Sequence, residues 1–346
     1  MTSHRIAIIG AGAVGGYFGA RFARAGLDVT FFDPWAEHVA QCARQGLTIE
    51  AMNPAENLRI RVDMRGIDAV QGILREAPID IAFIAVKSYD TVWATHLILP
   101  YLAADGIVVS LQNSFNEPLI ASIAGAERCF GCAIESLSCD LVAPGLVRRL
   151  SPGGSVAVGA MAPGRTAQLD RLCAVLSHAD PARVVDDLAS AKWSKLVINA
   201  MRNGLSAMTG MTGSERDSHP VTRALGIRLG AQTVQVGRAL GLSLTDTGYR
   251  FDTLVAAGAG DPGATAEIHA RMAEISAGRS STQSPSMAQD IRKGRRTETD
   301  AINGLVARRG RELGIDTDPH ERVHQQILRI ERGICQPSPD LAEGIL

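Results

Sequence analysis

The chain has 346 residues, and at about 100 to 200 residues per domain this length predicts two domains, each able to bury a core. Lysine and arginine together number 35, against 36 for aspartate and glutamate, which excludes a global field favouring nucleic acid or an anionic membrane. We therefore expect a small-molecule partner, with no nucleic-acid and no membrane partner.

Apolar run lengths, the N-terminus and the cysteines bear on the cellular compartment. The longest apolar runs, such as 79–86 broken by Asp80, are well short of the roughly 20 residues that cross a bilayer. Met1 is followed within ten residues by a glycine-rich turn, which leaves no room for a signal peptide. Six cysteines in a chain of this length do not indicate a disulfide framework. These features predict a cytoplasmic protein with reduced thiols.

The first half of the chain has the pattern of a doubly wound α/β domain. A helical pattern at 13–25 lies between two short apolar runs, which is the opening of a βαβ unit. Continuous apolar runs of strand length are typical of parallel strands covered on both faces. These runs lie at 6–9, 29–32, 81–86 and 107–111. We therefore predict a Rossmann domain over residues 1–186.

The second half has helical periodicity instead, at 188–208, 221–240 and 286–313. We predict an all-α domain over 187–335, followed by a frayed tail at 336–346 that carries two prolines. Residues 258–285 are rich in Gly, Ala, Ser and Thr, which favours a surface loop, with a mobile lid beside a cleft as the alternative.

Residues 10–15 carry the pattern GxGxxG directly after a predicted strand and at the start of a predicted helix. Gly10 permits a tight turn, Gly12 lets the backbone approach a pyrophosphate, and Gly15 lets the helix pack closely on the strand. The helix N-terminus faces the phosphates. This context predicts a dinucleotide site that includes Gly10, Gly12, Ala13, Val14 and Gly15.

Asp33 ends the second strand about 20 residues beyond this motif, where a carboxylate accepts hydrogen bonds from the ribose hydroxyls and repels a 2′-phosphate. NAD(H) is therefore the preferred cofactor. A capping or loop aspartate is the alternative, and nearby Arg44, Arg59 or Arg61 would allow NADP(H).

Polar pairs follow two further strands, Lys87-Ser88 after one and Gln112-Asn113 after the next. Ligands of open α/β sheets bind beyond the carboxyl ends of the strands, so both pairs are expected to project toward the cofactor. Capping of the following helices is the alternative.

A single helix is predicted at 193–207, with Lys195, Asn199 and Asn203 at positions i, i+4 and i+8 of one polar stripe. Asparagine is a mediocre helix former, so two asparagines beside a lysine favour a function over a merely exposed face. Reduction of a ketone requires a proton at the developing alkoxide, which a positioned lysine supplies while its charge stabilises that oxygen. Lys195 is therefore the candidate general acid.

Several separate motifs occur together in one order. They are GAGAVGGYFGA at 10–20, AVKS at 85–88, LQN at 111–113, KWSKLVINAMRN at 192–203, SMAQD at 286–290, Thr297-Glu298 and ING at 302–304. Through these motifs the chain resembles the ketopantoate reductase (2-dehydropantoate 2-reductase) family over nearly its whole length.

The resemblance implies a Rossmann domain, a helical domain, a cleft between them that closes over a 2-oxo acid, and a homodimer. It implies that Lys195 is the general acid and that Glu298 contacts the substrate hydroxyl or orients the lysine. Read alone, Glu298 would be a solvated residue of a charged helix. The resemblance further implies substrate contacts from Asn113, Asn199, Asn203 and Ser286, and a place near the cofactor for Lys87 and Asn113.

The chain also departs from the family pattern. The usual QNG is Gln112-Asn113-Ser114 here, and Pro34 replaces an arginine common in members that use NADP. Gly213 and Gln283 stand where enzymes acting on ketopantoate commonly carry asparagine. We therefore favour a relative acting on another small 2-oxo acid, and keep as alternatives an NAD-dependent dehydrogenase of a hydroxylated catabolite and a non-catalytic NAD(P)-binding regulator.

Three further patterns resemble functional motifs, but we interpret them as structural or solvent-exposed residues. His320 to His324 reads HExxH, as in zinc proteases, but it lies at a predicted helix start after Pro319 with no third ligand nearby, so we expect no metal. Cys129 and Cys132 form a CxxC inside a strand-like run and are expected to be core residues. The basic run 292–296 is expected to be a solvated helix face, with binding of a carboxylate or phosphate as the alternative.

Overall fold

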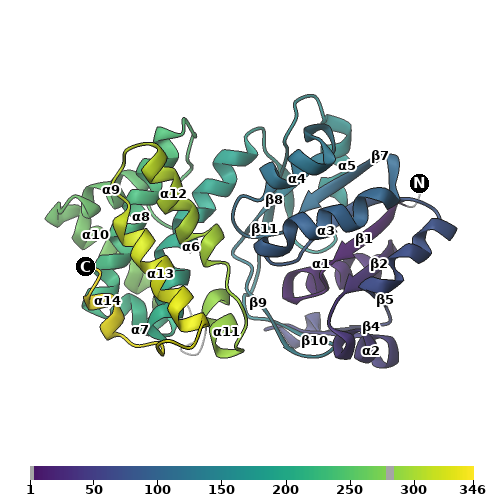
Figure 1. The fold of residues 1–346 in the computed structure, drawn as a ribbon, viewed down its shortest axis with the longest axis horizontal. Coiled ribbons are helices and arrows are strands. Elements are labelled where there is room, and N and C mark those ends of the chain that lie inside the picture. The colour runs from purple at the N-terminus through teal and green to yellow at the C-terminus, as the bar shows by residue number, and fades with distance from the viewer. Residues whose placement is uncertain (1–3, 278–283) are drawn as a thin grey trace. The chain divides into compact units, whose positions relative to one another are not determined.

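The computed structural model describes residues 4–277 and 284–346, and the chain divides into two compact units, Met1–Leu188 and Ala189–Leu346 (Figure 1). The first unit has two hydrophobic cores and the second has one of its own. The first unit is α/β and the second is helical, which confirms the predicted fold class.

The first unit is built on an eight-stranded sheet with the order β12-β11-β8-β7-β6-β1-β2-β5. Its strands are β1 (Arg5–Ile9), β2 (Asp28–Asp33), β5 (Asp63–Gly66), β6 (Ile79–Ile84), β7 (Leu102–Ser110), β8 (Cys129–Glu135), β11 (Ser155–Ala160) and β12 (Ala182–Val184). All neighbours pair in parallel except β8 and β11. The strand order reverses at β1, and such a switch point is where open α/β sheets bind ligands.

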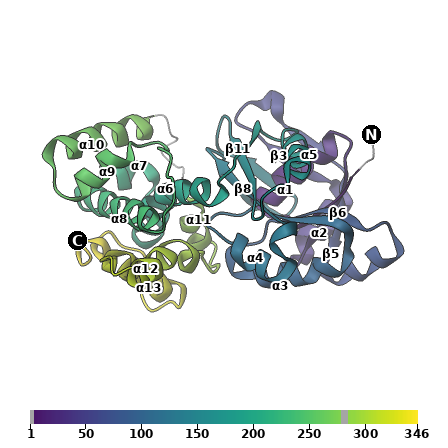
Figure 2. The same cartoon turned by 90° about the horizontal axis from the view of Figure 1, so that it is seen from above.

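Alternate residues of the strands fill separate cores on the two faces of this sheet. Ile6 and Ile8 pack in the core that includes α1 (Ala13–Arg24) and α5 (Thr166–Leu176). Ala7 and Ile9 pack in the core that includes α3 (Thr91–Ile98) and α4 (Glu117–Ala124). These two helices lie together on one face of the sheet in Figure 2. This two-sided burial explains why the strands read as continuous apolar runs.

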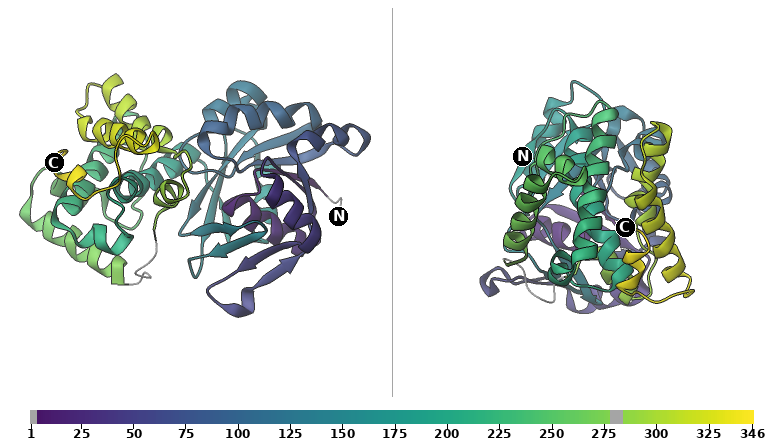
Figure 3. Two further views of the ribbon diagram at one scale, coloured as in Figure 1. Left: turned by 60° about the horizontal axis from the view of Figure 1, so that its bottom comes forward. Right: turned by 90° about the vertical axis from the view of Figure 1, so that its left-hand side faces the viewer.

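A second, four-stranded sheet has the order β4-β3-β10-β9 and contacts α1. Its strands are β3 (Leu47–Glu50), β4 (Leu58–Ile60), β9 (Cys139–Ala143) and β10 (Leu146–Arg149), and they come forward in the left view of Figure 3. Helix α2 (Ala36–Gln45) connects β2 to this sheet. Gly16 of α1 allows the approach, because an added Cβ there would lie 3.2 Å from Cγ2 of Val147.

Helix α8 (Pro220–Ala239) lies centrally in the second unit and contacts α9, α12 and α13 (Figure 2). The other helices are α6 (Leu188–Thr209), α7 (Gly213–Ser218), α9 (Phe251–Gly258), α10 (Pro262–Ala277), α11 (Ser286–Arg292), α12 (Asn303–Glu312), α13 (Asp318–Glu331) and α14 (Asp340–Glu343). Among the described residues, no helix combines the length and the apolar character needed to cross a bilayer.

Three expectations for the second unit are wrong. Most of the expected loop 258–285 is helix α10, which buries Ile268 and Met272; residues 278–283 lie outside the described part of the chain. The helical pattern 286–313 is interrupted, because α11 ends before Gly294, whose φ is 61°. The tail is not frayed, since Ala342 and Ile345 are buried in the helical core.

Candidate active site

The glycine turn after β1 requires glycine at two positions and leaves space at the third. Gly10 has a φ of 93°, and a Cβ there would lie 2.8 Å from Cγ1 of Val86. A Cβ on Gly15 would lie 2.1 Å from the carbonyl oxygen of Gly10, so α1 can pack here only with glycine. A Cβ on Gly12 would meet no atom within 4 Å, so the space above this residue fits an approaching pyrophosphate.

The N-terminus of α1 offers donors to the same space. Gly12 is the N-cap of α1 and has no side-chain cap. Ala13 and Val14 are the first helical residues and are partly exposed, and backbone N–H groups in a first turn have no partner within the helix. These N–H groups and the helix dipole suit an anion such as a pyrophosphate.

Asp33 is fixed next to the glycine turn. One carboxylate oxygen, Oδ2, accepts a hydrogen bond from the N–H of Ala11 at 2.7 Å, and Oδ1 accepts one from the N–H of Trp35 at 2.8 Å. The residue is only 8 % exposed. Each oxygen has a further lone pair, so the carboxylate retains acceptor capacity for ribose hydroxyls.

The arginines considered as partners of a 2′-phosphate lie toward the other end of α2. Arg59 donates to the carbonyl oxygen of Gln45 at 2.9 Å, and Arg44 donates to Oε1 of Gln41 at 3.2 Å. The backbone N of Arg61 lies beside Gly46, which follows α2. A helix of ten residues is about 15 Å long, and Asp33 is bound at its first end. The structure therefore gives no support to a phosphate-binding role for Arg44 or Arg59.

The segments after β6 and β7 are tied together by two amide side chains. Gln112 donates from Nε2 to the carbonyl oxygen of Val86 at 2.8 Å and to Oγ1 of Thr91 at 2.9 Å. Asn116, which the sequence analysis missed, donates from Nδ2 to Oγ of Ser88 and to the carbonyl oxygen of Asn113, both at 3.0 Å. Gln112 thus has a structural role at this edge of the sheet.

Lys87 and Asn113 are both partly exposed, and they follow neighbouring parallel strands. Ser114, which replaces the usual glycine of the family, has a φ of 65°. That left-handed conformation is the physical reason for a glycine at this position, and serine adopts it at a cost of about 1 kcal/mol. In the first unit, the glycine turn, Asp33, Lys87 and Asn113 therefore all lie at the carboxyl ends of strands of one sheet.

Helix α6 includes Lys195, Asn199 and Asn203, and the prediction of one helix across these residues is confirmed. Lys195 and Asn199 are partly exposed, whereas Asn203 is only 8 % exposed. Trp193 fixes the packing face by donating from Nε1 to the carbonyl oxygen of Thr233 at 2.9 Å. Over eight residues the polar stripe spans about 12 Å along the helix.

Ser286 and Glu298 lie on other elements of the same unit. Ser286 is the first residue of α11 and is partly exposed. Glu298 is only 6 % exposed and lies outside any α-helix, directly before the short 3-10 turn Thr299–Ala301. The interpretation of Glu298 as a solvated residue of a charged helix is therefore wrong. A buried carboxylate of this kind is a candidate for contact with a cation.

Two family models cover most of this chain. The model described as ketopantoate reductase PanE/ApbA matches residues 6–163, and its C-terminal counterpart matches residues 187–331. The chain belongs to the ketopantoate reductase family. It is therefore an NAD(P)-dependent oxidoreductase, as its sequence motifs predict.

Curated relatives and solved structures agree with this assignment. The 2-dehydropantoate 2-reductases of Archaeoglobus fulgidus and Caulobacter vibrioides are both 28 % identical, covering 96 % and 93 % of this chain and 99 % and 97 % of their own. A PanE/ApbA family ketopantoate reductase from Ralstonia eutropha is 28 % identical with a TM-score of 0.77, over 95 % of this chain and 99 % of its own. D-mandelate dehydrogenase, solved with NADH and anilino(oxo)acetate, shares the fold at 23 % identity and a TM-score of 0.81, over 95 % and 99 % of the two chains.

The HExxH of this family member has a structural role. His320 is fully buried, and burial lowers its pKa to about 3. Its Nδ1 lies 3.1 Å from Nδ2 of Asn303 and its Nε2 lies 3.0 Å from the carbonyl oxygen of Leu229, so both ring nitrogens are occupied. Within the described part of the chain no cluster of three or more potential metal ligands occurs. These contacts oppose the zinc interpretation.

The structure places the CxxC in the core of the first unit and the basic run on the surface of the second. Cys129 and Cys132 are buried in cores on opposite faces of the main sheet, as residues three apart in a strand must be, so they cannot pair with each other. In the basic run, Arg292, Lys293, Arg295 and Arg296 are exposed around the end of α11.

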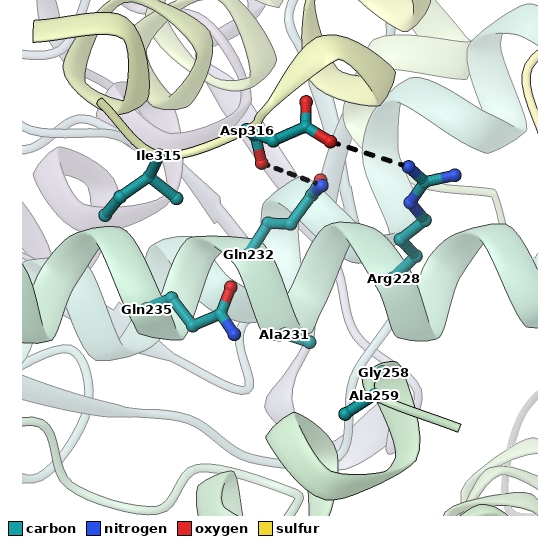
Figure 4. Close-up of a pocket in the computed structure, with 8 residues that line it drawn as sticks. All are labelled: Arg228, Ala231, Gln232, Gln235, Gly258, Ala259, Ile315 and Asp316. Atoms are coloured by element: carbon teal, nitrogen blue, oxygen red, sulfur yellow. Dashed lines mark hydrogen bonds and ion pairs between the residues drawn. The ribbon is translucent and has the colours of Figure 1, made fainter. Parts of the chain in front are cut away.

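A hollow of about 260 Å³ lies in the helical unit and contains none of the predicted site residues (Figure 4). Two contacts join polar groups of its lining: Gln232 donates from Nε2 to the carbonyl oxygen of Asp316 at 3.0 Å, and the Arg228 guanidinium lies 3.8 Å from the Asp316 carboxylate. The side chains of Arg228 and Asp316 are 38 % and 73 % exposed, so solvent screens this ion pair.

Proposed function

We propose that the protein reduces a small 2-oxo acid to the 2-hydroxy acid, prefers NADH over NADPH, and uses Lys195 as the general acid. The observation that carries this proposal is the stripe of Lys195, Asn199 and Asn203 on α6 in a chain that also has a glycine cradle fitting a dinucleotide. Family membership supports the reaction class.

The cradle residues explain binding and orientation of the cofactor. The first turn of α1 binds the pyrophosphate. Asp33 accepts hydrogen bonds from the ribose hydroxyls, and its negative charge disfavours binding of a 2′-phosphate. Lys87 and Asn113 orient the nicotinamide end from the neighbouring strand ends. The bound cofactor supplies the hydride.

The residues of the helical unit supply the proton and hold the substrate. Lys195 donates a proton from Nζ to the carbonyl oxygen that becomes the hydroxyl, and its positive charge stabilises that oxygen beforehand. Glu298 orients Lys195 or accepts a hydrogen bond from the hydroxyl of the product. The amides of Asn199 and Asn203 and the hydroxyl of Ser286 hydrogen-bond the carboxylate and fix which face of the carbonyl is presented.

The substrate is proposed to be a 2-oxo acid other than ketopantoate, or ketopantoate with altered contacts. Gly213 is buried at the start of α7 and offers no side-chain amide, and Gln283 lies outside the described residues. The oxidative direction is the second candidate, favoured by Asp33 because NAD⁺ is the usual cellular oxidant. The D-mandelate dehydrogenase that shares this fold was solved with NADH, which supports use of the NAD couple.

The experiment measures initial rates of NADH and NADPH oxidation by the purified protein with ketopantoate and a panel of aliphatic and aromatic 2-oxo acids. The reverse reaction is measured with the matching 2-hydroxy acids and NAD⁺. Turnover of at least one pair, faster with the NAD couple, supports the proposal. Tight dinucleotide binding without turnover of any pair contradicts it.

We also propose that the protein is a homodimer, since the structural neighbour from Staphylococcus aureus is a dimeric ketopantoate reductase. Light scattering after size exclusion should then give twice the 36.6 kDa of one chain. A mass of one chain at working concentration contradicts the dimer.

A further inference from the structure

Trp35 presents an aromatic ring next to the carboxylate expected to bind the adenosine ribose. Its backbone N–H donates to Oδ1 of Asp33 at 2.8 Å, which holds the Trp35 backbone next to that carboxylate. Its indole stacks on the ring of His38, with centroids 5.8 Å apart and 18° between the planes. The side chain is partly exposed. A fixed, partly exposed indole therefore adjoins the end of β2.

His38 is itself held from the second sheet. It is fully buried in α2, and its Nδ1 accepts a hydrogen bond at 2.9 Å from the N–H of Gly145, in the turn between β9 and β10. Since Nδ1 accepts a backbone N–H, the proton of the neutral ring is on Nε2, the atom that lies 3.9 Å from Sγ of Cys42. The imidazole is thus a rigid support under the indole.

We propose that Trp35 binds the adenine of the cofactor and that His38 is a positioning residue that holds the indole in place. This inference rests on the proposed function, because it assumes a dinucleotide at the glycine turn. Adenine is attached to the ribose that Asp33 would bind, so it lies beside the residues that follow β2. An indole face is the kind of surface on which nucleobases stack, and its flat shape needs little ordering on binding.

The two neighbouring residues then have separable effects. NADH and NADPH carry the same adenine, so Trp35 strengthens binding of both cofactors equally. Asp33 interacts with the 2′ position, so it sets the ratio between them. A contact with adenine must also be lost in any ligand fragment that lacks adenosine.

The experiment is titration calorimetry of the full-length protein with ADP-ribose, NADH, NADPH and reduced nicotinamide mononucleotide. Trp35→Ala should weaken binding of ADP-ribose, NADH and NADPH by a common factor of about 5 to 150, the range of a lost base stack. Binding of the mononucleotide should not change, and Trp35→Phe should restore most of the affinity. Trp93→Ala is the matched control, because Trp93 is 40 % exposed on α3, on the other face of the sheet.

His38 is tested with His38→Ala and His38→Phe, each checked for native circular dichroism. His38→Ala should raise the KM for NADH about two- to fivefold, a part of the Trp35 stacking effect, and leave kcat and the KM for the oxo acid unchanged. His38→Phe retains a flat ring under the indole and should recover affinity. A folded His38→Ala protein with wild-type affinity for ADP-ribose contradicts the positioning role.

The outcomes separate this inference from the proposed function. If the wild-type protein binds no ADP-ribose and no dinucleotide, both fail. If the wild-type protein binds and turns over its cofactor, but Trp35→Ala binds ADP-ribose within about twofold of it, only the adenine contact is overturned. A loss confined to NADPH would also overturn it, because adenine is common to both cofactors.

Discussion

The carboxylate of Asp33 accepts the backbone N–H of Ala11 at 2.7 Å, across 22 residues of sequence, inside the glycine turn. The same side chain therefore shapes the turn and presents oxygen atoms at the end of β2. A charged acceptor of backbone N–H groups is stabilising, and under the proposed binding mode its negative charge would repel a 2′-phosphate.

Replacement of Asp33 by asparagine should shift cofactor preference. Asp33→Asn keeps an oxygen that can accept the N–H of Ala11 but removes the charge, so the ratio of kcat/KM for NADH to that for NADPH should fall about 10- to 100-fold. Asp28→Asn is the control, since this aspartate lies at the other end of β2 with its side chain 58 % exposed. An unchanged ratio in Asp33→Asn would show that the carboxylate does not select the cofactor.

Substitution of two glycines of the turn by alanine should affect different properties, stability at Gly15 and dinucleotide binding at Gly12. Gly15→Ala places a methyl 2.1 Å from the carbonyl oxygen of Gly10 and should lower the free energy of unfolding by about 2 kcal/mol or more. Gly12→Ala meets no atom and should leave stability nearly unchanged while weakening dinucleotide binding at least about tenfold, because the methyl occupies the pyrophosphate space. Urea unfolding and calorimetry measure the two effects. Gly12→Ala with wild-type NADH affinity would mean that the cofactor does not approach this residue.

His320 should make the protein less stable in acid. Burial lowers the pKa of His320 from 6.5 to about 3, so the folded state resists protonation while the unfolded state takes up a proton below pH 6.5. Its contribution is therefore complete above the unfolded pKa and is lost as the pH falls from 6.5 toward 3, by about 1.4 kcal/mol per pH unit. Urea unfolding across this range gives the free energy of unfolding as a function of pH. The slope of that plot should be shallower in His320→Gln than in the wild type, by the equivalent of about one proton. Equal slopes would contradict a neutral buried imidazole.

Local patterns sufficed for the parts of the fold that depend on nearest neighbours in the chain. The glycine turn and helix α6 were predicted because their spacing alone carries the signal. Helix α10 was missed because its Gly, Ala and Thr composition resembles a loop. Its signals were Asp261, which caps the helix by accepting the N–H of Ala264, and the spacing of four between its buried residues Ile268 and Met272.

Features that depend on distant contacts were not accessible in this way. The second sheet joins β3 and β10, about a hundred residues apart, in short strands with mixed burial. The burial of Glu298 and the docking of Ile345 likewise come from packing against distant helices. Asn116 stands in a loop, where its bond to Ser88 depends on the spacing of two neighbouring strands.

The most direct test of the central claim compares Lys195→Ala with the wild-type protein on the best 2-oxo acid of the panel. If Lys195 donates the proton, kcat/KM should fall about 10²- to 10⁴-fold, with the Kd for NADH unchanged. Asn199→Ala, on the same stripe, should mainly raise KM for the oxo acid. A Lys195→Ala protein that retains kcat/KM within a few-fold of the wild type, at every pH tested, would contradict the assignment of Lys195 as the general acid.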